Sequence, residues 1–247
     1  MLTVADLTGL WRRSLIEWPD GRRDTTTQVR WLQGLRAFGD LRQPQPEADF
    51  SHARGLGDLS RQDCARLAQQ HAFAGHLTFA GPHFEWQRTI DYQPKASFPD
   101  VGSLRWESGV LIEQGRDVEY LEHWHREPCA TPAPAAALEL RDTRGINALL
   151  IRVGEFYIFA RDRAIVAAPH KTLGECVAAA ATIAQARALV DCEISFCRSA
   201  ADGVRVAAST LPYRVGEPLS AGLDGAWEIC ASEGDAAALG KFMRDSL

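Results

Sequence analysis

The sequence lacks a basic excess and long apolar runs. Its 247 residues include 27 Lys and Arg against 32 Asp and Glu, which gives a net charge of −5 at pH 7. Proteins that hold nucleic acid or anionic lipid present a basic surface, so this charge balance argues against both partners. The longest stretch of low polarity, residues 176–190, contains Thr182, Gln185 and Arg187. It is shorter than the roughly 18 apolar residues that a membrane-spanning helix needs, so we expect no membrane partner.

Cysteine is also scarce, and its spacing lacks a Cys-x-x-Cys pair. Such sparse cysteines do not form a disulfide scaffold, and in a reducing compartment they are expected to be small buried hydrophobes. The first residues contain no basic segment followed by an apolar one, so no secretory signal is predicted. We therefore expect a cytoplasmic protein. The six cysteines are Cys64, Cys129, Cys176, Cys192, Cys197 and Cys230.

What the sequence does contain is a series of short strand-like runs separated by turn signals such as Pro19-Asp20-Gly21. Strands at a spacing of about 8–12 residues, with no helix between successive strands, indicate an antiparallel barrel or sandwich. Parallel strands would need a crossover helix each time. In the first half, the runs that predict strands cover residues 9–18, 25–33, 35–42, 73–79, 84–92, 102–106, 110–113 and 118–126.

Two or three helices are expected beside these strands. Ser60 and Asp63 form a capping-box pattern that opens a helix over residues 61–70, and Thr172 and Glu175 repeat it before a helix over 175–189. The tail at 235–244 has a helical composition. The resulting fold class is mainly β, an antiparallel barrel with two or three accessory helices.

The segment 129–137, with two prolines and five alanines, divides the chain near its middle. Strand signals return after it, at 138–141, 146–153, 156–161, 193–198, 204–209 and 226–231. We favour a single enlarged barrel domain over 1–247, in which these later strands complete or extend the barrel. The alternative is a barrel over 1–128 followed by a second, α+β barrel-like domain over 138–247.

Gly9-Leu10-Trp11 leads into the first expected strand. This segment resembles the Gly-x-Trp motif of lipocalins and their calycin relatives, in which the Trp closes the barrel floor and an Arg packs over it. A helix that interrupts the early strands is similar to fatty-acid-binding-protein-like barrels. The pieces Asp40-Leu-Arg42, Phe73-Ala-Gly75, Ile90-Asp-Tyr-Gln-Pro94 and Tyr120-Leu-Glu-His-Trp124 extend the resemblance to a bacterial calycin-like family over roughly residues 5–127.

The resemblance implies a ligand-binding β-barrel with Gly9 and Trp11 at its closed end. The sequence departs from secreted lipocalins, because it has neither a predicted signal peptide nor an evident disulfide pair. An intracellular member of the calycin-like barrels is therefore the better expectation.

Side chains alternate between the two faces of a strand, so each run can be sorted by face. In three runs one face combines aromatic and charged residues, and together these faces would line a cavity with aromatic walls and a few polar groups. The predicted ligand-binding residues are Asp40, Arg42, Trp86, Arg88, Tyr92, Tyr120, Glu122, Trp124 and Arg126. Two alternatives stay open: the charges form structural ion pairs inside a filled barrel, or the faces are exposed to solvent.

The sequence leaves two chemical alternatives open, a metal site and an acid–base site. His123 and His125 share one strand face and could chelate a metal, but no third ligand has a diagnostic spacing, so neither a metal nor another cofactor is expected. Glu122, with Tyr120 as a proton donor, could act as a catalytic acid or base between aromatic walls. No P-loop, dinucleotide-binding glycine turn or nucleophile elbow supports a specific reaction.

The expected function is therefore non-catalytic binding of a small, partly apolar, anionic molecule in the barrel. The first alternative is an enzyme of the lyase, isomerase or hydrolase type that uses Glu122 and Tyr120 in the same cavity. The second is a protein–protein interaction module. A homodimer is compatible with each of them.

Overall fold

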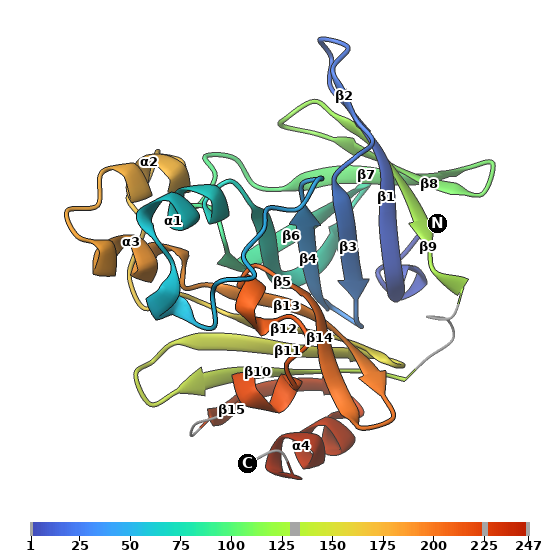
Figure 1. Ribbon diagram of the computed structural model, residues 1–247. Helices are drawn as coiled ribbons and strands as arrows, with labels where there is room; N and C mark the ends of the chain where they lie inside the picture. Colours follow the sequence, from blue (N-terminus) through green and yellow to red (C-terminus); the bar gives the residue numbers. More distant parts are fainter. Residues whose placement is uncertain (1, 129–133, 224–226, 246–247) are drawn as a thin grey trace.

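The computed structural model describes residues 2–128, 134–223 and 227–245, and it contains two antiparallel sheets (Figure 1). The first sheet has nine strands, and β1 pairs with both β3 and β9, so that eight of the strands close into a barrel. The remaining strand, β2, pairs only with the end of β1. The strands are β1 (Gly9–Glu17), β2 (Arg23–Asp24), β3 (Gln28–Gln33), β4 (Ala37–Gln43), β5 (His71–Ala80), β6 (His83–Asp91), β7 (Val101–Glu107), β8 (Val110–Gly115) and β9 (Leu121–Arg126).

The predicted fold class, a mainly β protein with a closed antiparallel barrel, is confirmed. All eight runs of the first half coincide with barrel strands to within a few residues. The expectation that the later strands complete or extend this barrel is corrected, because β9 already closes the barrel onto β1.

The later strands instead form a second sheet of six strands in the order β14-β13-β12-β11-β10-β15. Residues 129–133 of the expected linker lie outside the described residues, and β10 begins at Ala135. The strands are β10 (Ala135–Asp142), β11 (Asn147–Val153), β12 (Phe156–Arg161), β13 (Glu193–Ala200), β14 (Gly203–Ser209) and β15 (Trp227–Gly234).

Four α-helices are present in the described ranges, more than the two or three expected. Both predicted capping boxes are formed, Ser60 with Asp63 and Thr172 with Glu175. The expected helix over 175–189 is broken in two, because the Thr182 side chain accepts a hydrogen bond from the Gln185 N–H and starts a new helix. The helices are α1 (Arg61–Leu67), α2 (Leu173–Ala178), α3 (Ile183–Val190) and α4 (Ala236–Asp245). None of the helices in the described ranges has the length and apolar character to cross a membrane.

One hydrophobic core joins the two sheets. The outer face of the barrel, with Leu32, Leu41 and Ile90, packs on the inner face of the second sheet, and α1, α2 and α3 border this core. The contact is close at Gly39, where a Cβ atom would lie 2.6 Å from Cγ2 of Ile158. Because the sheets share this core, the choice between one domain and two stays a prediction. The other face of the second sheet is covered by α4 (Figure 1).

The last strand also binds the barrel directly. The Glu233 side chain on β15 accepts hydrogen bonds from the backbone N–H groups of Arg36 (3.1 Å) and Ala37 (2.8 Å), at the start of β4. Ala37 is buried, and a buried N–H group without a partner is costly, so the Glu233 carboxylate supplies an acceptor that the barrel strands do not provide.

Candidate functional site

One end of the barrel interior is filled by indole rings. The ring centroid of Trp31 lies 5.6 Å from that of Trp11 and 5.3 Å from that of Trp124. All three side chains are buried, and each indole N–H has an acceptor, which a buried Trp requires. This half of the interior is therefore a packed core.

The Gly9-Leu10-Trp11 segment lies at this filled end. Gly9 has φ +148°, a conformation that residues with a side chain rarely adopt, and it lets the chain turn into β1. The Arg126 guanidinium lies 4.5 Å from the centroid of the Trp11 ring and donates a hydrogen bond to the backbone oxygen of Asp6. This arrangement of Trp and Arg is the one that the calycin resemblance implied.

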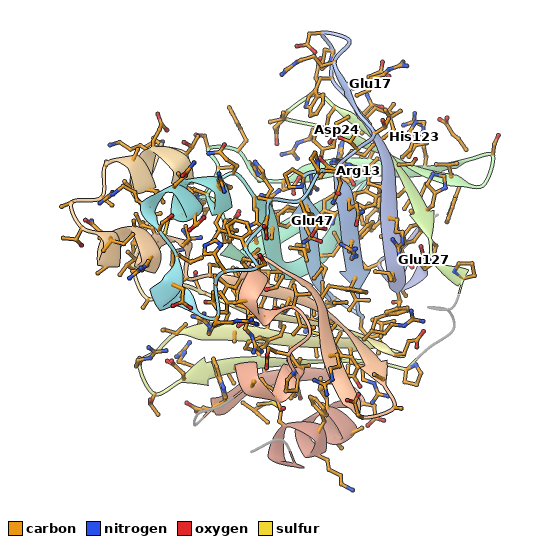
Figure 2. All side chains as sticks on the ribbon, in the orientation of Figure 1. Arg13, Glu17, Asp24, Glu47, His123 and Glu127 are labelled. Carbon is orange, nitrogen blue, oxygen red and sulfur yellow. The ribbon has the colours of Figure 1, made fainter. Side chains whose placement is uncertain are left out.

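The other half of the interior is charged. Glu122, 1% exposed, accepts hydrogen bonds from Arg13 (2.6 Å) and Arg42 (3.4 Å), which reach it from different strands. Arg42 also binds Asp40 at 2.8 Å. Arg13 also forms an ion pair with Asp24 at 3.3 Å, and Figure 2 labels these two residues. Each arginine is thus matched to carboxylates, as buried charges must be.

A second carboxyl group lies beside Glu122. Glu113 on β8 is the direct partner of Glu122 in the antiparallel register, so both side chains point into the barrel. Glu113 accepts hydrogen bonds from the Tyr120 hydroxyl (2.7 Å) and the Trp124 indole (3.0 Å), and that hydroxyl also lies 3.4 Å from Asp100. Burial, and then the charge of Glu122, raises the pKa of Glu113 well above its usual value.

A β-bulge at Thr89 decides which side chains of β6 face inward. Gly75 of β5 pairs with Arg88, but the next pair is Ala74 with Ile90, so Thr89 has no partner. A Cβ atom on Gly75 would lie 1.9 Å from the Gln87 backbone oxygen, so only glycine permits this close approach.

The bulge corrects the expectation that Trp86, Arg88 and Tyr92 share one face. Trp86 and Arg88 point into the barrel, where Arg88 binds Asp100 at 2.6 Å and Asp91 at 3.2 Å. Beyond the bulge the alternation is reversed, and Tyr92 packs in the core between the barrel and the second sheet. Burial there raises the pKa of the Tyr92 hydroxyl.

The charged interior opens to the outside between β6 and β7. These two strands form only two residue pairs, after which the chain between them diverges as a loop. The opening is a cavity of about 1020 Å³, which we call the barrel cleft. From the barrel it is lined by Trp86, Arg88, Asp91, Asp100 and Tyr120, and from the second half of the chain by residues 162–167 and Pro169.

The rim of the barrel cleft is apolar. Phe98, Val118 and Val166 line it, and these residues are 61%, 54% and 94% exposed. These residues come from three segments far apart in the sequence, so the fold gathers apolar surface at the mouth of a polar cavity.

Arg163 adds a buried cation to the same cleft. It is 9% exposed, and its guanidinium donates hydrogen bonds to the backbone oxygens of Asp91 (3.2 Å) and Tyr92. Its Nη1 atom is buried without a hydrogen-bond partner. No carboxylate lies within ion-pair distance of this guanidinium in the described part of the chain, whereas Arg13, Arg42 and Arg88 all have one.

The two histidines weighed as metal ligands do not lie in the cleft. His125 is exposed and its Nε2 lies 2.8 Å from the Ser14 hydroxyl, and His123 is half-buried on the same strand (Figure 2). Among the side chains that the structure describes, no three His, Cys, Asp or Glu residues are placed to hold a metal ion together.

The structure places two of the nine sequence-predicted ligand-binding residues outside the charged half of the interior, because Tyr92 packs between the sheets and Arg126 lies over Trp11 at the closed end. Trp124 belongs to the packed indole core, and the other six are Asp40, Arg42, Trp86, Arg88, Tyr120 and Glu122. Sequence reasoning missed Arg13, Asp100, Glu113 and Arg163. Glu113 could have been found, because it ends a short strand-like run and faces Glu122 in the next strand of a hairpin. Arg163 lies in an irregular segment, where no periodicity gives a signal.

No protein-family model and no curated protein matches this sequence. A crystal structure of an uncharacterized protein from Saccharomyces cerevisiae is similar in fold, with a TM-score of 0.51 and 13% sequence identity. The similarity covers 81% of this chain and 84% of the yeast chain. This coverage is more than the barrel or the second sheet could supply alone, so the likeness extends over both.

Proposed function

We propose that this protein binds a small, partly apolar, anionic molecule in the barrel cleft. The observation that carries the proposal is Arg163, a buried cation that lines the cleft without a carboxylate partner. Backbone oxygens satisfy part of its hydrogen bonding but do not neutralise its charge, so a ligand carboxylate would supply the missing counter-charge.

This proposal assigns the anion to a different arginine than the sequence suggested. Arg42 and Arg88 already bind carboxylates inside the barrel, and an anion would have to displace Asp40, Asp91 or Asp100 to reach them. Exchanging a protein carboxylate for a ligand carboxylate at the same arginine gains little binding free energy. Arg163 requires no such exchange.

The apolar part of the ligand is assigned to the rim. Phe98, Val118 and Val166 leave apolar surface in water at the mouth of the cleft, and a ligand that covers this surface gains free energy of about 25 cal/mol per Å². Small-molecule sites combine such apolar walls with a few placed polar groups, and a volume of about 1020 Å³ suits a medium-sized ligand.

The experiment combines native mass spectrometry of the purified protein with titration of decanoate, benzoate and phenylacetate. Decanol and benzamide serve as uncharged counterparts. Decanoate is expected to bind at least tenfold more tightly than decanol, since a hydrogen bond to a charged group contributes about 1.5–3 kcal/mol. Arg163→Met should remove this preference, while Arg105→Met, an exposed arginine on β7, should keep it. Equal binding of decanoate and decanol, or no binding of any acid, would refute the proposal.

A second candidate function, acid–base catalysis, is favoured by one observation. Glu113 has a raised pKa and is joined through the Tyr120 hydroxyl to the barrel cleft, which Tyr120 lines. Glu113 is a better candidate acid than Glu122, which two arginines hold. If a bound molecule found by mass spectrometry is converted with time, Glu113→Gln should stop that conversion without releasing the molecule. Cytoplasmic location, a homodimer and the interaction-module alternative stay predictions.

A further inference from the structure

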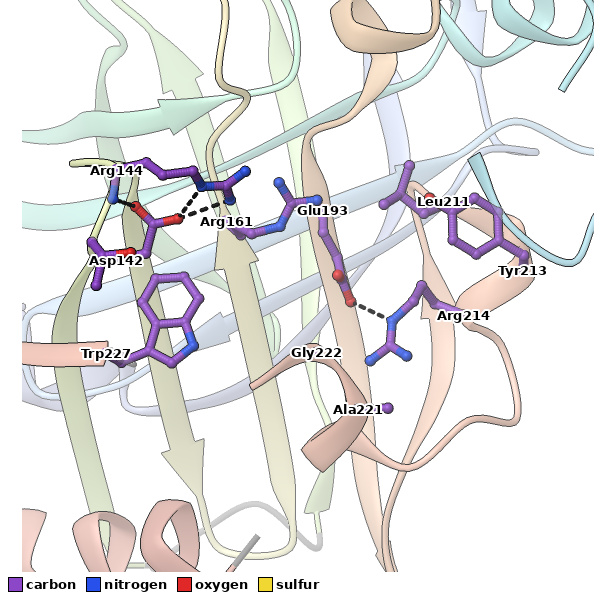
Figure 3. A pocket seen from close by; sticks show the side chains of 11 residues that line it. Asp142, Arg144, Arg161, Glu193, Leu211, Tyr213, Arg214, Ala221, Gly222 and Trp227 are labelled. Carbon is purple, nitrogen blue, oxygen red and sulfur yellow. Dashed lines mark hydrogen bonds and ion pairs between the residues drawn. The ribbon is translucent and has the colours of Figure 1, made fainter. Parts of the chain in front are cut away.

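A second pocket, of about 410 Å³, lies at one end of the six-stranded sheet (Figure 3). There β10 and β12 end and β13 and β15 begin, and the short 3₁₀ turns η4 (Pro212–Arg214) and η5 (Leu219–Gly222) cover the space. Arg161 and Glu193 are direct partners in the register of β12 and β13. They continue the side of each strand that carries Phe159 and Cys197, so the pocket is on the face turned away from the barrel.

A buried ion pair forms one wall of this pocket. Glu193 is 3% exposed and Arg214 is 9% exposed, and Arg214 Nε donates to Glu193 Oε1 at 3.0 Å. The Ser195 hydroxyl donates to the same oxygen at 2.7 Å. Within the described residues, Glu193 Oε2 and Arg214 Nη1 make no hydrogen bond, so each partner keeps an unused polar atom. A buried ion pair is rarely the most stabilising choice for a core, and this one borders an open pocket instead of packed side chains.

The opposite wall is aromatic and carries an unused donor. Trp227 lines the pocket, and its Nε1 is buried with no hydrogen-bond partner among the described residues. Figure 3 shows the indole on the other side of Arg161 from the Glu193–Arg214 pair. Arg161 binds Asp191 at 2.7 Å, so its charge is already balanced.

Close packing of η5 is built around the ion pair. A Cβ atom on Gly222 would lie 2.8 Å from Nη2 of Arg214 and 3.5 Å from Oε1 of Glu193. Glycine therefore allows the turn to border the charged wall directly, and the small residues Ala221 and Gly222 leave the space in front of the pair free.

We propose that this pocket binds a small zwitterion, a free α-amino acid being the simplest, with its carboxylate at Arg214 and Trp227 and its ammonium at Glu193. A zwitterion matches a neutral ion pair, since each of its charges meets the opposite one. An ion of one sign would attract one partner and repel the other. The side chain of the amino acid would lie on the Trp227 ring and Leu211, and the volume of about 410 Å³ is at the lower end of small-molecule sites.

The test is isothermal titration of the full chain with L-leucine, L-phenylalanine and L-glutamine. The matched probes are the N-acetyl and the methyl ester derivatives of each amino acid, which lack one charge and keep the side chain. At least one free amino acid is expected to bind, and both of its blocked forms should bind at least about tenfold more weakly, because each loses a charge-assisted hydrogen bond.

Two variants locate the binding. Trp227→Phe keeps an aromatic wall and removes the indole N–H, so it should weaken binding several-fold, and Glu193→Gln should weaken it further. Phe98→Ser alters only the barrel cleft and should leave binding unchanged. The proposal is overturned if no free amino acid binds at millimolar concentration, if a blocked form binds as well as the free one, or if Phe98→Ser weakens binding as much as Trp227→Phe. The blocked ligands keep the test decisive even if a variant does not fold.

Discussion

The two sheets of this protein hold charge in opposite ways. The barrel encloses ion pairs, with Arg13 and Arg42 bound to Glu122 in its interior. The second sheet is apolar on both faces, one toward the barrel and one toward α4, and its buried pair Glu193–Arg214 lies at a strand end. A closed barrel can match inward charges to one another across its width, whereas an open sheet between two apolar layers can hold charge only at its margin.

This difference is visible in the sequence. The barrel strand β4 is buried on both faces, yet its inward side carries the charged Asp40 and Arg42, while Gly39 and Leu41 face the second sheet. Residues 148–151 and 156–160 of the second sheet are also buried without interruption, but all of them are uncharged.

The largest loss of stability is expected when the ion pairs inside the barrel are broken. Glu122→Leu leaves Arg13 and Arg42 buried without their shared carboxylate, and the free energy of unfolding should fall by about 3–5 kcal/mol. Urea unfolding followed by circular dichroism measures this loss. The matched control is Glu107→Leu, whose partner Arg105 is exposed, and it should cost no more than about 1 kcal/mol. Similar losses in both variants would show that the barrel charges do not depend on one another.

A smaller effect tests the contact between the two sheets. Gly39→Ala places a methyl group 2.6 Å from Ile158 Cγ2, and such overpacking should cost about 1–3 kcal/mol. Ile158→Ala removes the opposing atoms, so the double variant should be more stable than the sum of the two single losses predicts. Additive losses in a double-mutant cycle would mean that the sheets do not meet as closely as the structure places them.

The smallest effect concerns the carboxyl pair inside the barrel. The pKa of Glu113 is raised in the folded protein above its usual 4.5, so the folded state keeps a proton that the unfolded state releases. Wild-type stability should therefore decrease as pH rises above about 4.5, by at most about 1.4 kcal/mol per pH unit from this group. Glu113→Gln has no such proton, and its stability relative to wild type should improve by at most about 1.4 kcal/mol between pH 5 and 6 in urea unfolding. Parallel pH profiles would contradict the assignment.

Much of the barrel could be predicted from local patterns. Gly9 and Trp11 mark its closed end because a positive φ and a large ring have few other uses at a strand start. The faces of β4 and β9 follow from simple alternation, which places Asp40, Arg42 and Glu122 inside.

The site was less predictable for two physical reasons. One unpaired residue, Thr89, reverses the alternation of side chains and moves Tyr92 out of the barrel. No residue pattern in the run Phe84 to Tyr92 predicts this β-bulge. The barrel cleft also depends on Arg163 and Val166, which reach it through packing of the second sheet on the barrel. Contacts between segments so distant in the sequence cannot be predicted from the local periodicity of hydrophobic residues.

The hydrogen bonds from Arg36 and Ala37 to Glu233 have a consequence for synthesis on the ribosome. The barrel strands are complete once β9 has left the exit tunnel, so this part can fold while the rest is still being translated. Its apolar outer face then stays in water until β11, β12 and β13 emerge, and its two N–H groups at the start of β4 lack their carboxylate partner until Glu233 follows, more than a hundred residues after β9. A nascent chain stalled between β9 and β11 should therefore expose this apolar face to chaperones, and completion of β13 should end that exposure.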